Sequence, residues 1–147
     1  MRLFVPITID ATWVAIEMAT LREIGGPITW IALPTASASL PGVAAWRGRA
    51  IAVADLAAVL GAGERLAAPG GRIRTLYIQQ GASTLAVPVD GVREPLMISN
   101  EDIRPARVRT EAFCLGEVDV EGHTTLIVDL GVLLPGYRPA AAASVPH

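Results

Sequence analysis

The sequence predicts an all-β protein made of two small barrels of similar plan, with short helical turns between some strands. Helical periodicity is nearly absent, and short β-branched runs alternate with Gly, Pro and charged turns, as in all-β barrel proteins. Hydrophobic residues make up 52% of the chain but aromatic residues only 5%, so Val, Ile, Leu and Ala must fill the interior. A pattern in the first half of the chain recurs in the second half, which indicates a duplicated architecture.

Turn residues separate the expected strands along the whole chain. In order, these strands are Leu3–Ile9, Thr12–Met18, Ile28–Ala32, Ala44–Arg47, Arg49–Ala54, Arg74–Gln79, Ser83–Val89, Ala112–Val120 and Thr124–Val128. Asp55 and Asp129 each follow a strand. We expect both to be structural caps of the next helical turn, because a carboxylate there accepts hydrogen bonds from otherwise unpaired backbone N–H groups.

The internal repeat is clearest around two glycine-bounded segments. The first segment contains Gly42, Gly48, Asp55-Leu56 and Leu60, and the same spacing recurs 74 residues later at Gly116, Gly122, Asp129-Leu130 and Leu134. An earlier stretch, "WVAIEMATLRE", aligns with "TLAVPVDGVRE" at an offset of 71 residues. We therefore expect two similar β-units, with a flexible connection between them near residues 61–72. Residues 137–147 lack periodicity and are expected to be a disordered tail.

Charge and hydropathy exclude several classes of protein. A net charge of -2, without a Lys/Arg cluster beside aromatic residues, argues against a nucleic-acid binder. The mean hydropathy of +0.46 is high, but the longest uncharged stretch contains three prolines and is poor material for a membrane-spanning helix. The sequence starts without a signal-peptide pattern, and Cys114 is the only cysteine. We expect a cytoplasmic globular protein with no direct membrane insertion.

Few side chains offer catalytic chemistry. His123 falls in an expected hairpin turn and His147 is the last residue, and neither has a Ser or Cys partner in its sequence context. We read Cys114 as a small apolar residue rather than a reactive thiolate. We therefore expect no catalytic residue and no cofactor.

Three alternating carboxylates raise the possibility of a metal site. A strand would present Glu117, Asp119 and Glu121 on one face, where they could hold a hard cation such as Ca²⁺ or Mg²⁺. Solvent-facing strand positions are commonly polar, however, and we favour that interpretation. A metal-dependent enzyme is the alternative, and no matching base or nucleophile supports it.

Arg47, between Trp46 and Gly48, has two open interpretations. It is either a surface arginine that lies over Trp46 or pairs with a carboxylate, or a planar, donor-rich group held at a barrel rim for a partner protein. Its position in the sequence does not decide between them.

The segment "GVAAWRGRAIAVADLAAVLG" resembles the "GvinlRGxiipviDLrxxLG" signature of CheW-like domains. Other segments resemble the family in the same order: Leu21–Ile24, Ile28–Gly42, Leu85–Ala106 and Phe113–Leu134. The resemblance implies two interleaved, five-stranded, SH3-like barrels around a shared apolar core, as a single domain over residues 1–136. It also implies a non-catalytic adaptor that couples a CheA-type histidine kinase to the cytoplasmic tips of methyl-accepting chemoreceptors, recruited to membrane-associated receptor arrays.

The resemblance assigns roles to individual residues. Arg47 matches the family arginine implicated in receptor coupling. The expected receptor-binding residues are Arg47, Trp46, Val43, Ile24 and Val92, and the expected kinase-binding residues are Leu21, Glu23 and Gly42.

Four positions depart from the family pattern. Trp46 makes the rim beside Arg47 bulkier, Pro88 is expected to interrupt a strand, Pro95 replaces an aliphatic residue, and Ala86 replaces a common glycine. The last three lie in the second unit, so its partner surface is expected to be altered. The alternative function is therefore a divergent CheW-like protein of a surface-motility or developmental pathway that retains only one of the two partners.

Overall fold

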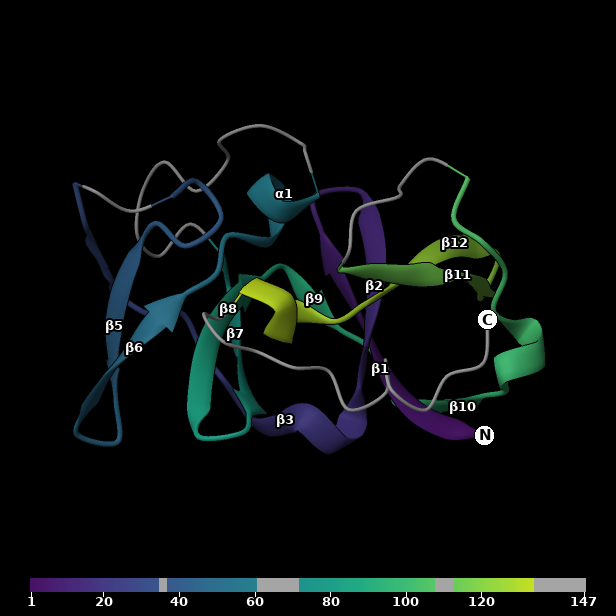
Figure 1. Ribbon diagram of the computed structural model, residues 1–147, viewed down its shortest axis with the longest axis horizontal. Helices are drawn as coiled ribbons and strands as arrows, with labels where there is room; N and C mark the ends of the chain where they lie inside the picture. The colour runs from purple at the N-terminus through teal and green to yellow at the C-terminus, as the bar shows by residue number, and fades with distance from the viewer. Residues whose placement is uncertain (35–36, 61–71, 108–112, 134–147) are drawn as a thin grey trace.

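The computed structural model describes residues 1–34, 37–60, 72–107 and 113–133 (Figure 1). The strands are β1 (Arg2–Ile9), β2 (Thr12–Glu17), β3 (Leu21–Gly25), β4 (Ile31–Ala32), β5 (Gly42–Trp46), β6 (Arg49–Val53), β7 (Arg74–Gln80), β8 (Ser83–Val89), β9 (Gly91–Val92), β10 (Leu96–Ile98), β11 (Cys114–Val120) and β12 (His123–Val128). The helical turns are η1 (Met18–Thr20), α1 (Leu56–Val59), η2 (Asn100–Asp102) and η3 (Leu130–Leu133). The expected all-β class with short helical turns is confirmed.

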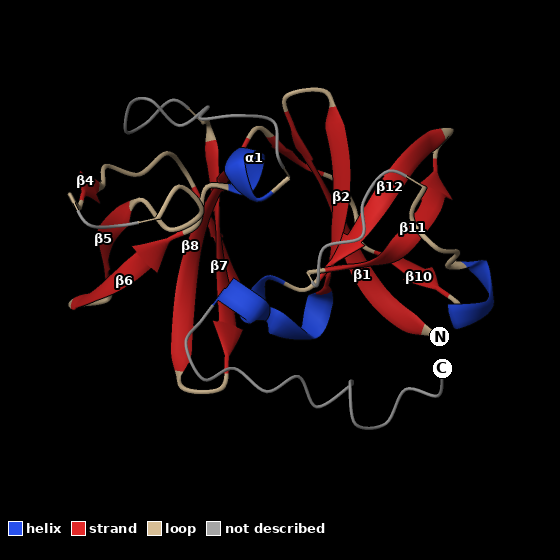
Figure 2. Cartoon of the chain, turned by 45° about the horizontal axis from the view of Figure 1, so that its top comes forward, coloured by secondary structure: helices blue, strands red, loops and turns tan. Residues whose placement is uncertain are grey.

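The strands form two six-stranded sheets that lie side by side (Figure 2). The first sheet has the order β10-β1-β2-β12-β11, with β9 also paired to β1, and the second has the order β3-β7-β8-β6-β5-β4. Each sheet joins two hairpins through one parallel contact, β2 with β12 and β8 with β6. The two sheets therefore share one plan, as the repeat predicted.

The two halves of the sequence are exchanged between the sheets. Hairpin β1–β2 pairs with β11–β12, whereas β7–β8 pairs with β5–β6, so each sheet takes one hairpin from each half. Residues 61–71 lie outside the described residues, and the strands before and after them, β6 and β7, belong to the same sheet. The expectation that this segment connects the two barrels is therefore wrong. The chain passes from one sheet to the other at η1 and at Asp90. The expected tail over residues 137–147 also lies outside the described residues.

Alternation along the strands divides the apolar side chains between three clusters. In β1, Val5, Ile7 and Ile9 belong to a cluster shared by both sheets. Phe4 belongs instead to a cluster formed by residues of the first sheet. In β8, Leu85 and Val87 belong to the shared cluster, whereas Ala86 belongs to a third cluster, on the other face of the second sheet. α1 lies between the sheets and adds Leu56 to the shared cluster (Figure 2). Because successive side chains of a strand point to opposite faces, each sheet can contribute to two cores.

An arginine ties the sheets together where the chain crosses between them. The Arg72 guanidinium is 9% exposed and forms ion pairs with Asp10 at 2.9 Å and Asp90 at 3.0 Å. Asp10 lies in the β1–β2 turn and Asp90 follows β8. The hydrogen bond from Arg72 to Asp10 is the main cause of a raised pKa at Arg72.

Four details of the strands differ from expectation. Strands β3, β9 and β10 were not expected, because they are short and pair with strands far away in the sequence. Pro88 does not interrupt β8, which continues to Val89. Ala86 accepts a hydrogen bond from Ala54, and the backbone N–H and C=O groups of Ala86 and Pro88 point to the same side, away from β7. The last β6–β8 pair joins Val53 to Ala86. Pro88 lies beyond that pair, so its nitrogen is not at a position where the β6–β8 ladder needs an N–H donor.

The two aspartates stand at the starts of the helical turns that follow β6 and β12. The Asp55 Oδ1 accepts a hydrogen bond from the Ala58 N–H at 3.3 Å, as the N-cap of α1. The Asp129 Oδ1 accepts one from the Gly131 N–H at 3.0 Å, in η3.

Among the described residues, no helix is long and apolar enough to cross a membrane.

Candidate protein-binding surface

Arg47 lies in the two-residue turn between β5 and β6. Arg47 and Gly48 have φ angles of 50° and 76°, the left-handed pair that a tight hairpin turn requires. The turn holds the Arg47 side chain at the tip of the hairpin, where the side chain is 64% exposed. Its guanidinium carbon lies 4.8 Å from the centroid of the Trp46 ring. Arg47 therefore makes both contacts that the surface-arginine interpretation named. It stacks on Trp46, and it pairs with a carboxylate, Glu23.

Glu23 of β3 is the carboxylate that pairs with Arg47. Its Oε1 atom accepts hydrogen bonds from Arg47 Nη2 at 3.0 Å and from Trp46 Nε1 at 3.2 Å. The bond from Arg47 is the main cause that lowers the pKa of Glu23. Trp46 in turn stacks on Tyr77 of β7, with ring centroids 5.3 Å apart. Burial, and then the charge of Glu23, raise the pKa of Tyr77.

These four residues, which we call the Arg47 cluster (Glu23, Trp46, Arg47 and Tyr77), close the second sheet on itself. β3 is the first strand of that sheet and β5 the fifth, yet their side chains meet at hydrogen-bonding distance. The sheet must therefore curl into a barrel with its seam at the Arg47 cluster. The result is a fixed guanidinium beside an aromatic plane, a combination typical of residues that anchor protein contacts.

The other sequence-predicted receptor residues lie in different places. Ile24 follows Glu23 on β3 and is 43% exposed, but its side chain points to the opposite face of the strand from Glu23. Val43 is half-buried on β5, paired with Ile31 of β4. Val92 lies in the first sheet, paired with Ile7 of β1, and packs against the shared cluster. The structure therefore places Ile24 on the other face of β3 from the Arg47 cluster, and Val92 in the other barrel.

The predicted kinase residues divide in a similar way. Leu21 and Glu23 lie on β3, which is an edge strand, and Leu21 packs partly against the shared cluster. Gly42 is buried, and a Cβ atom there would lie 2.0 Å from the Ile31 carbonyl oxygen. A residue in that position offers no side chain to a partner, so the kinase contact expected at Gly42 is corrected to a close-packing role.

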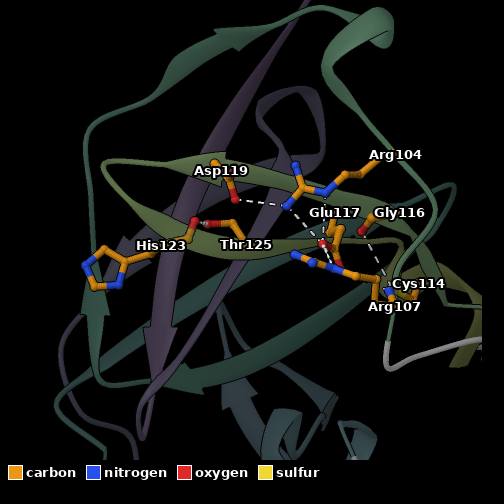
Figure 3. Close-up of polar contacts among 8 residues, drawn as sticks. All are labelled: Arg104, Arg107, Cys114, Gly116, Glu117, Asp119, His123 and Thr125. Atoms are coloured by element: carbon orange, nitrogen blue, oxygen red, sulfur yellow. Dashed lines mark hydrogen bonds and ion pairs between the residues drawn. The ribbon is translucent and has the colours of Figure 1, made fainter.

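The three alternating carboxylates do not gather into one site. Glu117 is only 1% exposed, contrary to the expected solvent-facing position, while Asp119 is exposed on the same strand. Arg104 contacts both, at 2.9 Å in each case (Figure 3). Glu121 lies in the β11–β12 turn and pairs instead with Arg93 at 3.0 Å. Within the described part of the chain, no group of His, Cys, Asp and Glu is arranged to hold a metal ion.

Glu117 closes the first sheet as Glu23 closes the second. Its carboxylate accepts hydrogen bonds from Arg104 Nε at 3.0 Å, the Arg107 backbone N–H at 3.0 Å and Arg107 Nε at 3.2 Å. The backbones of Arg104 and Glu117 also exchange hydrogen bonds of 3.0 and 2.8 Å. Arg104 follows β10 at one edge of the sheet and Glu117 lies on β11 at the other, so the bridge joins the two edges. The hydrogen bond from the Arg107 backbone is the main cause that lowers the pKa of Glu117.

His123 is part of an aromatic pair that the sequence did not indicate. It lies exposed at the start of β12 and stacks on Trp13 of β2, with ring centroids 4.1 Å apart and planes 8° from parallel. The Arg93 guanidinium lies 5.3 Å from the Trp13 centroid. Several residues that contact the sequence-predicted ones come from strands or loops distant in sequence, so no spacing pattern could have revealed them. They are Trp13, Tyr77, Arg93 and Arg104.

Fold and surface together define a protein of two curled sheets around a shared core, with Arg47 exposed and held in place by Glu23 and Trp46. The chain belongs to the CheW-like domain family, whose model matches residues 4–137.

Two proteins show the same relationship. The chain is 28% identical over 131 residues to the chemotaxis protein CheW of Rhizobium meliloti (strain 1021), a match that covers 86% of this chain and 83% of that protein. Its fold is similar to the crystal structure of the scaffolding protein TtCheW from Thermoanaerobacter tengcongensis, with a TM-score of 0.75 and 20% identity. That alignment covers 95% of this chain and 97% of TtCheW. The resemblance read from the sequence is therefore confirmed.

Proposed function

We propose that this protein is a non-catalytic adaptor that couples a CheA-type histidine kinase to the cytoplasmic tip of a methyl-accepting chemoreceptor. It would act in the cytoplasm, at receptor arrays on the membrane. The observation that carries the proposal is the Arg47 cluster, which presents an exposed arginine in a fixed position within a CheW-like domain. Membership of the family and the similarity to a chemotaxis protein and a scaffolding protein support the same role.

The receptor contact is proposed for Arg47 and Trp46, together with Ile24 of β3 and Val43 of β5. Arg47 is held by Glu23 and Trp46, so little side-chain entropy remains to be lost when a partner binds. Val92 would contribute from the other barrel. The kinase contact is proposed for the edge strand β3, at Leu21 and Glu23.

The adaptor with only one partner is less well supported, because the structure accommodates the residues that suggested it. β8 passes through Pro88 without a break, and Ala86 is buried inside the second barrel. Pro95 is exposed between β9 and β10 and takes part in no strand. Ala86 and Pro88 do not distort the second barrel, and Pro95 lies beside strands of the first, so we favour binding of both partners.

Binding measurements with purified proteins test the proposal. A kinase regulatory domain and a receptor cytoplasmic fragment from the same organism are titrated against the wild-type protein and against the variant Arg47→Glu. We expect both partners to bind the wild type, and the receptor fragment to bind Arg47→Glu about tenfold more weakly or worse. If neither partner binds the wild type, the adaptor function is wrong.

Arg49→Glu is the matched control. Arg49 is exposed, lies two residues from Arg47 and forms no ion pair among the described residues, and its guanidinium carbon is 6.0 Å from the Trp46 centroid. The charge change is the same, so general electrostatic repulsion would weaken both variants alike. Equal weakening of Arg47→Glu and Arg49→Glu would remove the specific role of Arg47.

A further inference from the structure

The chain passes from the second sheet to the first through a single residue, Asp90. β8 ends at Val89 in the second sheet, and β9 begins at Gly91 in the first. In Figure 1, β9 lies in the middle of the molecule, between β8 and β2. The Asp90 backbone N–H donates to the Thr8 carbonyl oxygen at 2.9 Å, which attaches this crossing to β1. A joint of one residue leaves the orientation of the two sheets to the contacts that surround it.

Arg72 makes ionic contacts on both sides of this crossing. It lies two residues before β7 of the second sheet, and its Nη1 atom donates to Asp10 Oδ1 at 2.9 Å and to both carboxylate oxygens of Asp90 at 3.0 Å. Asp10, in the β1–β2 turn of the first sheet, also donates its backbone N–H to Asp90 Oδ2. We call these three residues the Arg72 clasp (Asp10, Arg72 and Asp90). The clasp joins the first sheet to the start of β7 through one guanidinium.

The burial of Arg72 indicates a role in geometry more than in stability. Its side chain is 9% exposed. A buried ion pair often stabilises a fold no better than apolar side chains of similar volume, because both charges must leave water. The apolar contacts of the shared cluster hold the two sheets together, but the hydrophobic effect is non-directional. Bonds from one planar guanidinium to two carboxylates do have a fixed direction. The Arg72 clasp therefore restrains how the sheets are turned relative to each other.

The clasp lies between the two parts of the proposed receptor contact. Val92 follows Asp90 by two residues on β9 of the first sheet, whereas Arg47 lies in the second sheet, between β5 and β6. We propose that Arg72 is a positioning residue, which fixes the orientation of the two sheets and so holds Val92 at a constant place relative to Arg47. The receptor part of this inference rests on the proposed function. Arg72 acts through Asp10 and Asp90 and needs no contact of its own with a partner.

Binding measurements separate this role from a general loss of stability. The triple variant Arg72→Met, Asp10→Asn, Asp90→Asn removes all the charges of the clasp, so that no charge is left there without its partner. We expect the receptor fragment to bind this variant about three- to tenfold more weakly, because the two parts of its site are no longer pre-organised. The kinase domain should bind it as it binds the wild type, because the proposed kinase contact lies on β3 alone. Receptor binding that is unchanged, or that falls together with kinase binding, would overturn the positioning role.

Residual dipolar couplings of the full-length, ¹⁵N-labelled protein test the clasp without any partner. In the wild type, the amides of both sheets should fit one alignment tensor. In the triple variant, the two sheets should need different tensors, while the melting temperature stays close to that of the wild type. If a single tensor still fits the variant with its sheets in the wild-type orientation, the inference is wrong. If instead neither partner binds the wild type, the adaptor function is wrong, and the couplings still decide whether Arg72 sets the orientation.

Arg74→Met is the matched control. Arg74 is exposed on β7, two residues from Arg72, and forms no ion pair with any described residue. The same type of side chain is lost, so the couplings and both affinities should remain those of the wild type. If the triple variant does not fold, Arg72→Lys repeats the test, because lysine keeps the charge but lacks the planar fork. We expect Arg72→Lys to weaken receptor binding alone, and behaviour like that of Arg74→Met would then overturn the inference.

Discussion

In the first barrel a buried carboxylate closes the sheet, whereas in the second barrel the closing carboxylate is accessible to solvent. The Glu117 side chain is 1% exposed and lies beside a backbone bridge, while the Glu23 side chain is 39% exposed and closes its seam through side chains alone. A buried charge must have all its hydrogen bonds satisfied within the protein, which leaves no capacity for a partner. Glu23 has no such constraint, and Arg47 beside it stays exposed. The difference separates a seam closed inside the protein from one whose charged groups remain open to solvent.

The two hairpins that carry these seams also differ in the sign of their charges. β5–β6 contains Arg47 and Arg49, whereas β11–β12 contains Glu117, Asp119 and Glu121. Their turns keep the same backbone, since Glu121 and Gly122 have φ angles of 51° and 81°, close to those of Arg47 and Gly48. The repeat has therefore retained the turn geometry while the side chains diverged toward different tasks.

The largest effects on stability should come from Gly42→Ala and Gly116→Ala, one in each hairpin. A Cβ at Gly42 would meet the Ile31 carbonyl oxygen at 2.0 Å, and one at Gly116 would meet the Arg104 carbonyl oxygen at 2.7 Å. Gly116 also has a φ of 150°, which L-residues rarely adopt. We expect each variant to lose at least about 2 kcal/mol of unfolding free energy in urea.

Gly26→Ala is the control, because an added Cβ there would contact nothing within 4 Å. It should remain close to the wild type. If Gly42→Ala resembled Gly26→Ala, β4 would not be packed closely on β5 at Ile31.

A smaller effect on stability should distinguish Glu117 from Glu23, the carboxylates that close the two sheets. Glu117→Gln is expected to lower the melting temperature at neutral pH by several degrees, because the amide cannot replace the charge that faces Arg104 and Arg107. Glu23→Gln should lower it less, since its ion pair is exposed and screened by solvent.

The pH dependence of stability follows from the same pKa shifts. Both carboxyls have a folded-state pKa below the ordinary value of 4.5, so each contributes stability above that value, and the contribution is lost as the pH falls through the folded pKa. Both Glu117→Gln and Glu23→Gln should therefore flatten the fall in melting temperature on the acid side of pH 4.5. We expect the larger change for Glu117→Gln, because Glu117 is buried and Glu23 is 39% exposed to screening solvent. Equal flattening would mean that the two seams are alike in strength.

Much of the fold could be predicted because its signals are local. Glycine after a charged residue marks the two hairpin turns, apolar alternation marks the long strands, and the spacing between Gly42 and Asp55 repeats from Gly116 to Asp129. The resemblance implied interleaved barrels, but which hairpins are exchanged between the sheets could not be predicted, because it depends on contacts such as Val53 with Ala86 that no local pattern encodes.

The candidate site was only partly predictable for the same reason. Arg47 could be identified from the family signature, but its partner Glu23 lies 24 residues away and acts through space. Burial of Glu117 could not be read from its sequence neighbours, because Arg104 and Arg107, which satisfy it, come from the loop before β11. A carboxylate that alternates with apolar residues is otherwise typical of an exposed strand face.

The aspartates after the two hairpins should show intermediate effects of similar size. Asp55→Ala removes the hydrogen bond to the Ala58 N–H, and Asp129→Ala removes the one to the Gly131 N–H. Loss of such a cap costs about 0.5–2 kcal/mol. Urea unfolding measures both, and receptor binding of the folded fraction should not change. Loss of binding at unchanged stability in Asp55→Ala would make that carboxylate a partner contact.

The smallest effects on stability should come from reversing the charges at the two hairpin tips. Arg47→Glu and Glu121→Arg change exposed side chains in turns of the same backbone, and Glu121 itself shows that glutamate fits there, so each should alter unfolding free energy by no more than about 0.5 kcal/mol. Receptor binding should nevertheless fall for Arg47→Glu alone. Combining Arg47→Glu with Glu23→Arg restores an ion pair across the second seam with its polarity reversed. If Arg47 contacts the receptor, this double variant should still bind weakly. If binding recovers in the double variant, the receptor requires only a closed seam, and Arg47 acts by positioning its neighbours.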